Sequence, residues 1–345
     1  MKTTIAGFRF AVRLFLLATP LFFLAGCIKQ KILVVVNPDG TGNIVVTRVF
    51  SPEAVAMAES SYREMRRHPA DFGPAAGAAA TNDPFFSEAK LKTEGKLYGR
   101  GVELVKGQKI DRHGARGSVA VYRFKDVNQV RIPMAREETF MMMASPEVTE
   151  VDEDMQDTFA SQMEAGDAVL FSLTKGARNS LKIQMPSRLL EATAEAAERA
   201  KAEAGKPPEA HATEPVDAEE EDATDGEFAA MGGRFGMSGR ESEADAARQS
   251  LKGMRLALDV EVRGNVARST AGHAAKDRPQ RFSLYDLDFD TVMASPRFDA
   301  VARENRMTNP SDIQESLGAL IGLPGAVLET NKEVVVEFKQ AEAAP

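Results

Sequence analysis

The composition near the middle of the chain limits how the rest of the chain can fold. Nine Asp or Glu and no Lys or Arg lie between residues 209 and 227, and the wider stretch 205–240 is also rich in Pro, Gly and Ala. Such a segment cannot bury enough apolar surface to offset the entropy lost on ordering. We therefore expect a helical and then disordered acidic linker at 188–242, which separates two folded blocks at 27–187 and 243–340.

Both folded blocks contain strand patterns that pair through short turns. The runs are rich in β-branched residues, and turn-forming residues such as Asn37-Pro-Asp-Gly-Thr-Gly42 lie between them. In the first block the expected hairpins are 31–36 with 43–50, 102–105 with 118–124, and 169–173 with 180–185. In the second block, 255–263 alternates apolar and polar residues, 282–289 is its expected partner, and 333–338 is a last strand.

Helix patterns fall between the strands. Ser51 can cap a helix whose first position suits Pro52, and Val55, Ala58, Tyr62 and Met65 then share one face. Further helices are expected at 85–97, within 133–166, at 296–306 and at 311–321, the last with Ser311 and Gln314 at capping-box spacing.

Neither folded block is rich in core residues by itself, and the second has few strands. With 43% hydrophobic and 27% charged residues among 345, the chain has an ordinary globular composition. We predict an α+β fold with one mixed or antiparallel sheet of hairpins, which takes strands from both blocks and carries helices on one face. The acidic excursion interrupts this domain. Two independent domains are the alternative.

The N-terminal residues 1–26 resemble the signal peptide of a bacterial lipoprotein. Lys2, Arg9 and Arg13 precede an apolar stretch, 14–24, which is too short for a comfortable membrane span. Leu-Ala-Gly-Cys then ends at Cys27, the chain's single cysteine, and resembles a lipobox. The resemblance implies cleavage before Cys27 and acylation of that residue, palmitate included. A signal-anchor helix with a buried cysteine is the alternative.

A lipidated Cys27 implies a location in the cell envelope. Each buried CH₂ contributes about 0.8 kcal/mol, so several acyl chains would give a stable membrane anchor. Ile28 follows the cysteine, where an Asp would resemble an inner-membrane retention signal. The resemblance therefore favours the outer membrane, with the protein facing the periplasm or the cell surface.

The charge and the scarce metal-binding residues exclude several classes of function. A net charge of −8 argues against nucleic acid as a partner, and one Cys with four His leaves little for a metal or a cofactor. Asn37–Gly42 copies the start of a calcium loop, but Arg48 stands where the twelfth-position acid is needed. Asp286, Asp288 and Asp290 alternate, which fits either a cation site or a strand with its acids outward. We expect no metal and no cofactor.

Nothing in the sequence resembles a catalytic motif. Gly-x-Ser-x-Gly and the P-loop pattern are absent from the chain. His68, His113, His211 and His273 each lie in or beside an expected loop. Asp111 and His113 could act as an acid/base pair only if a nucleophile converged on them. We therefore predict a protein that is not an enzyme, with a lipid-anchored hydrolase as the third hypothesis.

Charge is distributed unevenly along the first block. Residues 96–131 hold nine basic and three acidic residues, whereas 137–167 hold ten acids and no base. The basic part could face lipid phosphates, or the two parts could simply attract each other within the fold.

The most unusual local composition in the chain is the run Phe140, Met141, Met142 and Met143. Flexible Met side chains suit apolar surfaces that accept varied ligands, and they also fill gaps in cores. A Cu(I) site is a further alternative. We name Phe140 and Met141–Met143 as candidate ligand-binding residues.

The order of these features is similar to that of the mycobacterial LppM-type lipoproteins. The similarity covers Gly26-Cys27, the hairpin 31–50 with its Asp-Gly-x-Gly turn, the helix after Ser51, residues 122–126 and the late strand 256–262. It implies an α+β module that handles lipids or glycolipids. We predict a lipid-anchored envelope protein of binding or structural type, with a membrane and an envelope protein or lipid as partners. A carrier of an apolar lipid or glycolipid ligand is the alternative.

Overall fold

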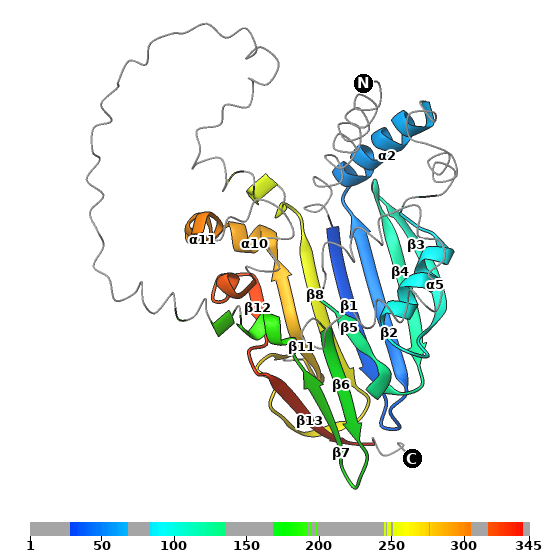
Figure 1. Ribbon diagram of the computed structural model, residues 1–345, viewed down its shortest axis with the longest axis vertical. Coiled ribbons are helices and arrows are strands. Elements are labelled where there is room, and N and C mark those ends of the chain that lie inside the picture. Colours follow the sequence, from blue (N-terminus) through cyan, green and yellow to red (C-terminus); the bar gives the residue numbers. More distant parts are fainter. Residues whose placement is uncertain are drawn as a thin grey trace, which may run out of the picture.

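The computed structural model describes residues 28–67, 85–134, 168–191, 251–275, 277–304 and 317–340, together with residues 83, 193–194, 198, 245 and 247–249. Two β-sheets form the body of this part of the chain, and helices lie at their edges and ends (Figure 1). The described part therefore mixes helices and sheets, as the sequence predicts.

The large sheet contains eight strands and joins segments far apart in the sequence. Its order is β10 (Ala274–Ala275), β11 (Arg278–Asp288), β8 (Arg255–Val262), β1 (Ile28–Val36), β2 (Gly42–Phe50), β4 (Ala115–Phe124) and β3 (Glu103–Arg112), with β12 (Ala326–Leu328) paired to β11. Neighbouring strands are antiparallel except β1 and β8, which run parallel from Lys29↔Arg255 to Val36↔Val262. Parallel strands need a long connection. Here the connection is the whole stretch of chain from the end of β1 at Val36 to the start of β8 at Arg255.

The small sheet has five strands in the order β5 (Arg131–Pro133), β6 (Ala168–Thr174), β7 (Asn179–Gln184), β13 (Glu333–Lys339) and β9 (Asn265–Ser269). All of its pairings are antiparallel. Residues from both sides of the expected acidic excursion meet here too, because β7 pairs with β13.

The core lies between the two sheets. Alternate side chains of β1, β2, β4 and β8 turn inward, among them Val34, Ile44, Tyr122 and Val260, and meet Phe171, Ile183, Val336 and Phe338 of the small sheet. We call this side of the large sheet the inner face. The predicted hairpins form, but they divide between two sheets instead of one. The inner face that we expected helices to cover is covered largely by the second sheet.

Helices complete the inner face at its ends. α2 (Pro52–Arg67) lies against β4 and begins at Ser51, whose hydroxyl accepts a hydrogen bond from the Ala54 amide. α5 (Glu88–Leu97) lies against β3. Near the other edge are α10 (Phe289–Met293), α11 (Phe298–Glu304) and the 3₁₀ turn η3 (Leu317–Leu320). A second 3₁₀ turn, η2 (Val127–Gln129), precedes β5.

Several expectations fall outside the described residues. They are the signal peptide, the acidic excursion, the helices within 135–166 and the start of the helix at 311–321. Within the described part of the chain, no helix is both long and apolar enough to cross a membrane.

Candidate binding surface

The side of the large sheet that faces away from the small sheet, which we call the outer face, presents half-buried valines in regular rows. The strand register places Lys29, Val49, Gly117 and Ile110 in one row across β1, β2, β4 and β3. The next rows along these strands are Lys31, Thr47, Val119 and Gln108, and then Leu33, Val45, Val121 and Lys106. The outer face is therefore apolar along its middle and basic at its margins.

A hollow of about 680 Å³ lies on this face, lined by Val49, Gln108, Lys109, Ile110, Asp111, Arg112 and Val119. Gly117 lies between Val49 and Ile110 in the strand register but is not among the residues that line the hollow. A side chain cannot be added there, because a Cβ on Gly117 would lie 2.0 Å from the Arg48 carbonyl oxygen. A volume of this size lies within the range of small-molecule sites.

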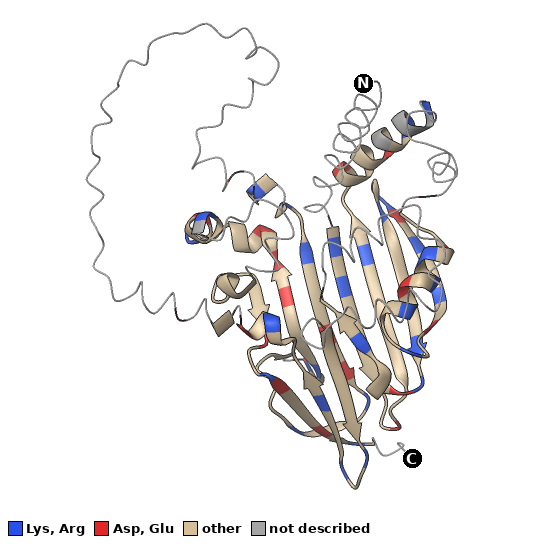
Figure 2. Ribbon diagram, viewed as in Figure 1, with Lys and Arg blue, Asp and Glu red and all other residues tan. Residues whose placement is uncertain are grey.

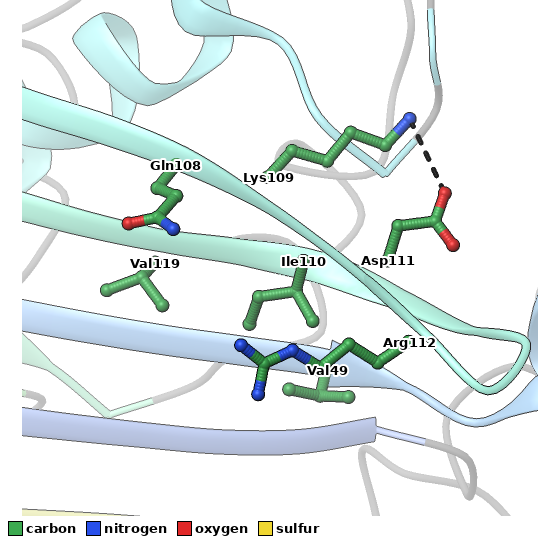
Figure 3. A pocket seen from close by; sticks show the side chains of 7 residues that line it. All are labelled: Val49, Gln108, Lys109, Ile110, Asp111, Arg112 and Val119. Carbon is green, nitrogen blue, oxygen red and sulfur yellow. Dashed lines mark ion pairs between the residues drawn. The ribbon is translucent and has the colours of Figure 1, made fainter.

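Successive side chains of a strand point to opposite faces, so the residues that line the hollow lie on two sides of β3. Val49, Val119, Ile110, Gln108 and Arg112 lie on one side of the β3 ribbon, and Lys109 and Asp111 project to the other side (Figure 3). The hollow therefore has an apolar floor, with an amide and a guanidinium beside it.

Cations without a partner border the apolar rows. Lys29, Lys106, Arg112 and Arg123 are exposed, and their side chains project from the outer face and make no ion pair or side-chain hydrogen bond with any described residue. Blue segments along β1 and the β3–β4 edge mark this basic character, whereas β11 carries red segments (Figure 2). Glu103 stands opposite Arg123 in the register, so an anion that approached this part of the face would meet Lys29, Lys106 and Arg112 as its unpaired cations among the described residues.

The β8–β11 part of the outer face is different, because its charges are paired. Asp259 receives Arg281 Nη2 at 2.6 Å and Lys31 Nζ at 3.1 Å, and Arg255 binds Asp286 at 2.7 Å. Burial raises the pKa of the Asp259 carboxyl, but the hydrogen bonds from Arg281 and Lys31 outweigh burial and hold the pKa below its ordinary value. In this half of the outer face, Asp259 and Asp286 therefore already bind the neighbouring cations.

A buried ion pair on the inner face holds α5 against the sheet. Arg48 Nη2 lies 3.0 Å from Glu94 Oε1, and Arg48 Nε donates to Gln30 at 3.1 Å. The Tyr98 hydroxyl donates to the same Glu94 oxygen at 2.6 Å. Glu94 is only 4% exposed. These contacts fix α5 over β3 and so position the strand that forms one wall of the hollow.

Burial shapes the electrostatics of this inner cluster. Burial alone lowers the pKa of Arg48, but the Glu94 charge overcomes it and the pKa of Arg48 rises. Burial and then the Glu94 charge raise the pKa of Tyr98 and of Tyr122. The Tyr122 hydroxyl is buried near Glu94 but forms no hydrogen bond of regular geometry with the described residues. These pKa shifts keep Arg48 charged and the two tyrosines neutral.

The candidate calcium-like loop is a hairpin turn. The Asp39 carboxylate accepts hydrogen bonds from the Thr41 amide at 2.9 Å and from the Thr41 hydroxyl at 2.7 Å. Those bonds hold the pKa of Asp39 below its ordinary value. Gly40 has φ 86°, and Val36 pairs directly with Gly42. Arg48, at the twelfth position, points to the inner face and binds Glu94.

The three alternating aspartates also have separate partners. Asp286 binds Arg255, Asp288 caps α10 through the Thr291 amide, and Asp290 accepts from the Gly253 amide at 2.7 Å. Within the ranges that the structure describes, no three His, Cys, Asp or Glu side chains gather to hold a metal ion.

Asp111 and His113 lie at the β3–β4 hairpin. Asp111 faces Arg116 Nε at 3.5 Å and Lys109 at 4.0 Å. His113 occupies the turn with φ 51°. No hydrogen bond joins the two side chains. His273 Nε2, just before β10, lies 3.2 Å from the Leu328 carbonyl oxygen of β12. The structure therefore does not bring the hydrolase candidates together, and His68 and His211 lie outside the described residues.

Cys27 and the candidate ligand residues Phe140 and Met141–Met143 lie outside the described residues. The hollow was missed because its floor comes from three strands. One signal was present in the sequence: residues 96–131 carry a local excess of six positive charges. Lys106, Arg112 and Arg123 belong to that segment.

Comparisons with known proteins do not establish a family for this chain. No protein-family model matches the chain, and no curated protein matches it. Among solved structures, the NMR structure of the folded domain of the Mycobacterium tuberculosis LppM protein covers 93% of this chain and 94% of its own, with 8% identity and a TM-score of 0.29. That protein bears the name of the group that the sequence motifs resemble, but values this low establish neither a shared fold nor a shared function.

Proposed function

We propose that this chain is a lipid-anchored, non-enzymatic protein of the cell envelope that holds an anionic phospholipid on the outer face of its large sheet. The observation that carries the proposal is the hollow beside Gly117. Its floor of Val49, Ile110 and Val119 is apolar, and Arg112 stands at its margin. The lipobox-like sequence ending at Cys27 supports a location at a membrane, with the outer membrane favoured by Ile28.

The chemistry of the face favours an amphiphile over a purely polar ligand. Half-buried valines can cover an acyl chain, and each buried CH₂ contributes about 0.8 kcal/mol. The unpaired cations around them supply the complementary charge for a phosphate, which guanidinium groups bind especially well. A neutral lipid would satisfy the valines but leave Arg112, Lys106 and Lys29 without a partner.

The two halves of the outer face differ in whether their cations are paired, and this difference indicates where the ligand binds. The β8–β11 half has charges too, but Asp259 and Asp286 already bind its cations. An anion there would displace existing ion pairs, whereas on the β1–β2–β4–β3 half it would not. We therefore place the ligand over β2, β4 and β3.

Native mass spectrometry of the full processed chain in detergent tests the proposal. The probes are phosphatidylglycerol and phosphatidylcholine with identical acyl chains. We expect a one-to-one adduct with phosphatidylglycerol that survives at energies at which the phosphatidylcholine adduct is lost. Val49→Glu places a carboxylate on the floor of the hollow, and we expect it to weaken the phosphatidylglycerol adduct at least about tenfold, or about 1.4 kcal/mol.

Val327→Glu is the matched control, because Val327 is a half-buried valine that pairs with Asp286 on the ion-paired half of the same face, away from β2, β4 and β3. It introduces the same charge and should retain most of the binding. Equal loss in both variants, or equal binding of the two lipids by the unchanged protein, would refute the proposal. An envelope protein partner, the remaining hypothesis, would then be sought by crosslinking.

A further inference from the structure

The hollow lies at the end of the sheet where the chain enters the fold. β1 begins at Ile28, which is 1% exposed and paired with Phe50. Lys29 stands in the same row as Val49 and Ile110, which line the hollow. An acyl group on Cys27 would therefore be attached directly before a fixed strand, with no linker, and within two residues of the row that contains the hollow.

The same end of the sheet carries the β3–β4 turn and α2, while the β1–β2 turn lies at the opposite end (Figure 1). Two of the unpaired cations of the outer face, Lys29 and Arg112, are at the end where β1 begins. Two neighbouring acids there are neutralised, because Arg116 binds Glu59 at 2.7 Å and Asp111 at 3.5 Å.

We propose that the protein stands on its anionic membrane with the β3–β4 turn toward the lipid headgroups, so that Lys29 and Arg112 contact phosphates and the hollow opens at the bilayer surface. This inference rests on the lipid anchor and the phospholipid ligand proposed above. It adds that the ligand is taken from the leaflet that holds the anchor. A tether of zero length keeps this end at the membrane, and each basic residue near an anionic surface strengthens the contact.

Two positions of the β3–β4 hairpin report the orientation. Arg112 pairs with Ala115, and Arg123 lies eight residues further along β4, so the two are separated by about 27 Å at about 3.3–3.4 Å per residue. Both are exposed arginines on the outer face that make no ion pair with a described residue. Arg112→Cys and Arg123→Cys therefore each remove one equivalent cation, and each adds one site for a spin label.

The experiment uses the full processed chain in vesicles of phosphatidylglycerol and phosphatidylcholine that contain a nickel-chelating headgroup lipid. Cys27 is the chain's one cysteine, so an acylated protein without a new cysteine should take no label. We expect nickel to relax the label at position 112 several-fold more strongly than the label at position 123.

Equal relaxation at the two positions, or stronger relaxation at 123, would overturn the proposed orientation while the anchor stands. If the unsubstituted chain takes label at Cys27 and does not float with the vesicles, the anchor itself is absent and both proposals fall. A retained difference between 112 and 123 in pure phosphatidylcholine would assign the orientation to the tether alone and overturn the role of Lys29, which both labelled variants keep.

Discussion

At the scale of single residues, buried polar groups are the most sensitive points of the fold. The two tyrosines beside Glu94 are both buried, but the Tyr98 hydroxyl binds Glu94 at 2.6 Å, whereas the Tyr122 hydroxyl forms no hydrogen bond of regular geometry with the described residues. A hydrogen bond to a charged group stabilises a protein by about 1.5–3 kcal/mol, whereas an unsatisfied buried hydroxyl is a cost. Residues of the same type should therefore respond differently to the same substitution.

We expect Tyr98→Phe to lower the free energy of unfolding by about 1.5–3 kcal/mol. Tyr122→Phe should leave it unchanged or raise it slightly, because the lost hydroxyl makes no hydrogen bond of regular geometry. Urea unfolding of the two variants beside the unchanged protein measures the difference. A larger loss in Tyr122→Phe than in Tyr98→Phe would show that this account of the cluster is wrong.

Asp259 should make stability depend on pH. Its pKa is lower in the folded protein than its unfolded value of about 3.9. Its contribution is therefore present above about pH 4 and is lost as the pH falls through the folded pKa. We expect Asp259→Asn to destabilise the protein at pH 7, and the difference from the unchanged protein to shrink as the pH falls from 4 to 2. Urea unfolding across that range gives the curve, and a difference independent of pH would contradict it.

At the scale of elements, a few contacts between residues far apart in the sequence hold a short helix in place. α5 is ten residues long and is capped by Ser87, and helices this short are marginal in isolation. The Arg48–Glu94 pair and the close approach of Gly95 to the Tyr122 ring hold it to the sheet. The helix therefore depends on its packing more than on its own propensity.

Breaking that pair should release α5. We expect Glu94→Gln to cost about 3–5 kcal/mol, since it removes the carboxylate charge that Glu94 sets against the buried Arg48 guanidinium. The double variant Arg48→Met with Glu94→Gln should recover most of the loss, because no charge then stays buried. Hydrogen exchange of residues 88–97 should increase in the single variant. A double variant less stable than the single one would refute the argument.

The β3–β4 turn offers a stabilising change. His113 and Gly114 both have positive φ, 51° and 81°, and Arg112 pairs directly with Ala115. Asn followed by Gly is the preferred sequence for a two-residue turn of this kind. We expect His113→Asn to stabilise the protein by roughly 0.5–1 kcal/mol and His113→Val to destabilise it, since a β-branched residue resists this conformation. Thermal unfolding of the pair decides the order.

At the scale of the whole molecule, both sheets join the two sides of the expected excursion. β1 pairs with β8, and β7 pairs with β13. A single cooperative unit is therefore our proposal for the domain organisation. Residues 27–187 and 243–340, made separately, should each lack the two-state unfolding of the full chain and should regain it when mixed. Circular dichroism of the fragments and their mixture tests this, and a fragment that unfolds cooperatively alone would favour two domains.

The excursion itself should be dispensable for stability. Shortening a closed loop to half its length lowers the entropic cost by only about 0.6 kcal/mol. We expect replacement of residues 205–240 by a short Gly-Ser linker to leave the free energy of unfolding unchanged or up to about 1 kcal/mol higher. Urea unfolding measures this, and a loss of several kcal/mol would show that the segment packs on the fold.

The local elements were predictable from the sequence by itself. Asn37–Gly42 forms a turn because Asp39 binds the backbone of Thr41 and Gly40 adopts positive φ. The alternation of 255–263 places Leu258 and Val260 inward whatever strand pairs with it. These properties depend on a few neighbouring residues and on the two-residue period of a strand. The lipobox-like sequence at Cys27 is of the same local kind, and its lipid stays a prediction.

The tertiary structure decided the arrangements that need residues far apart. The parallel pairing of β1 with β8, the division of the hairpins between two sheets and the Arg48–Glu94 pair each join distant segments. Of the candidate surface, the basic character of 96–131 was visible in the sequence, but the hollow was not. Val49, Val119 and Ile110 form one floor only because the register sets β2, β4 and β3 side by side. That register is a property of three strands together, so no single stretch of sequence contains it.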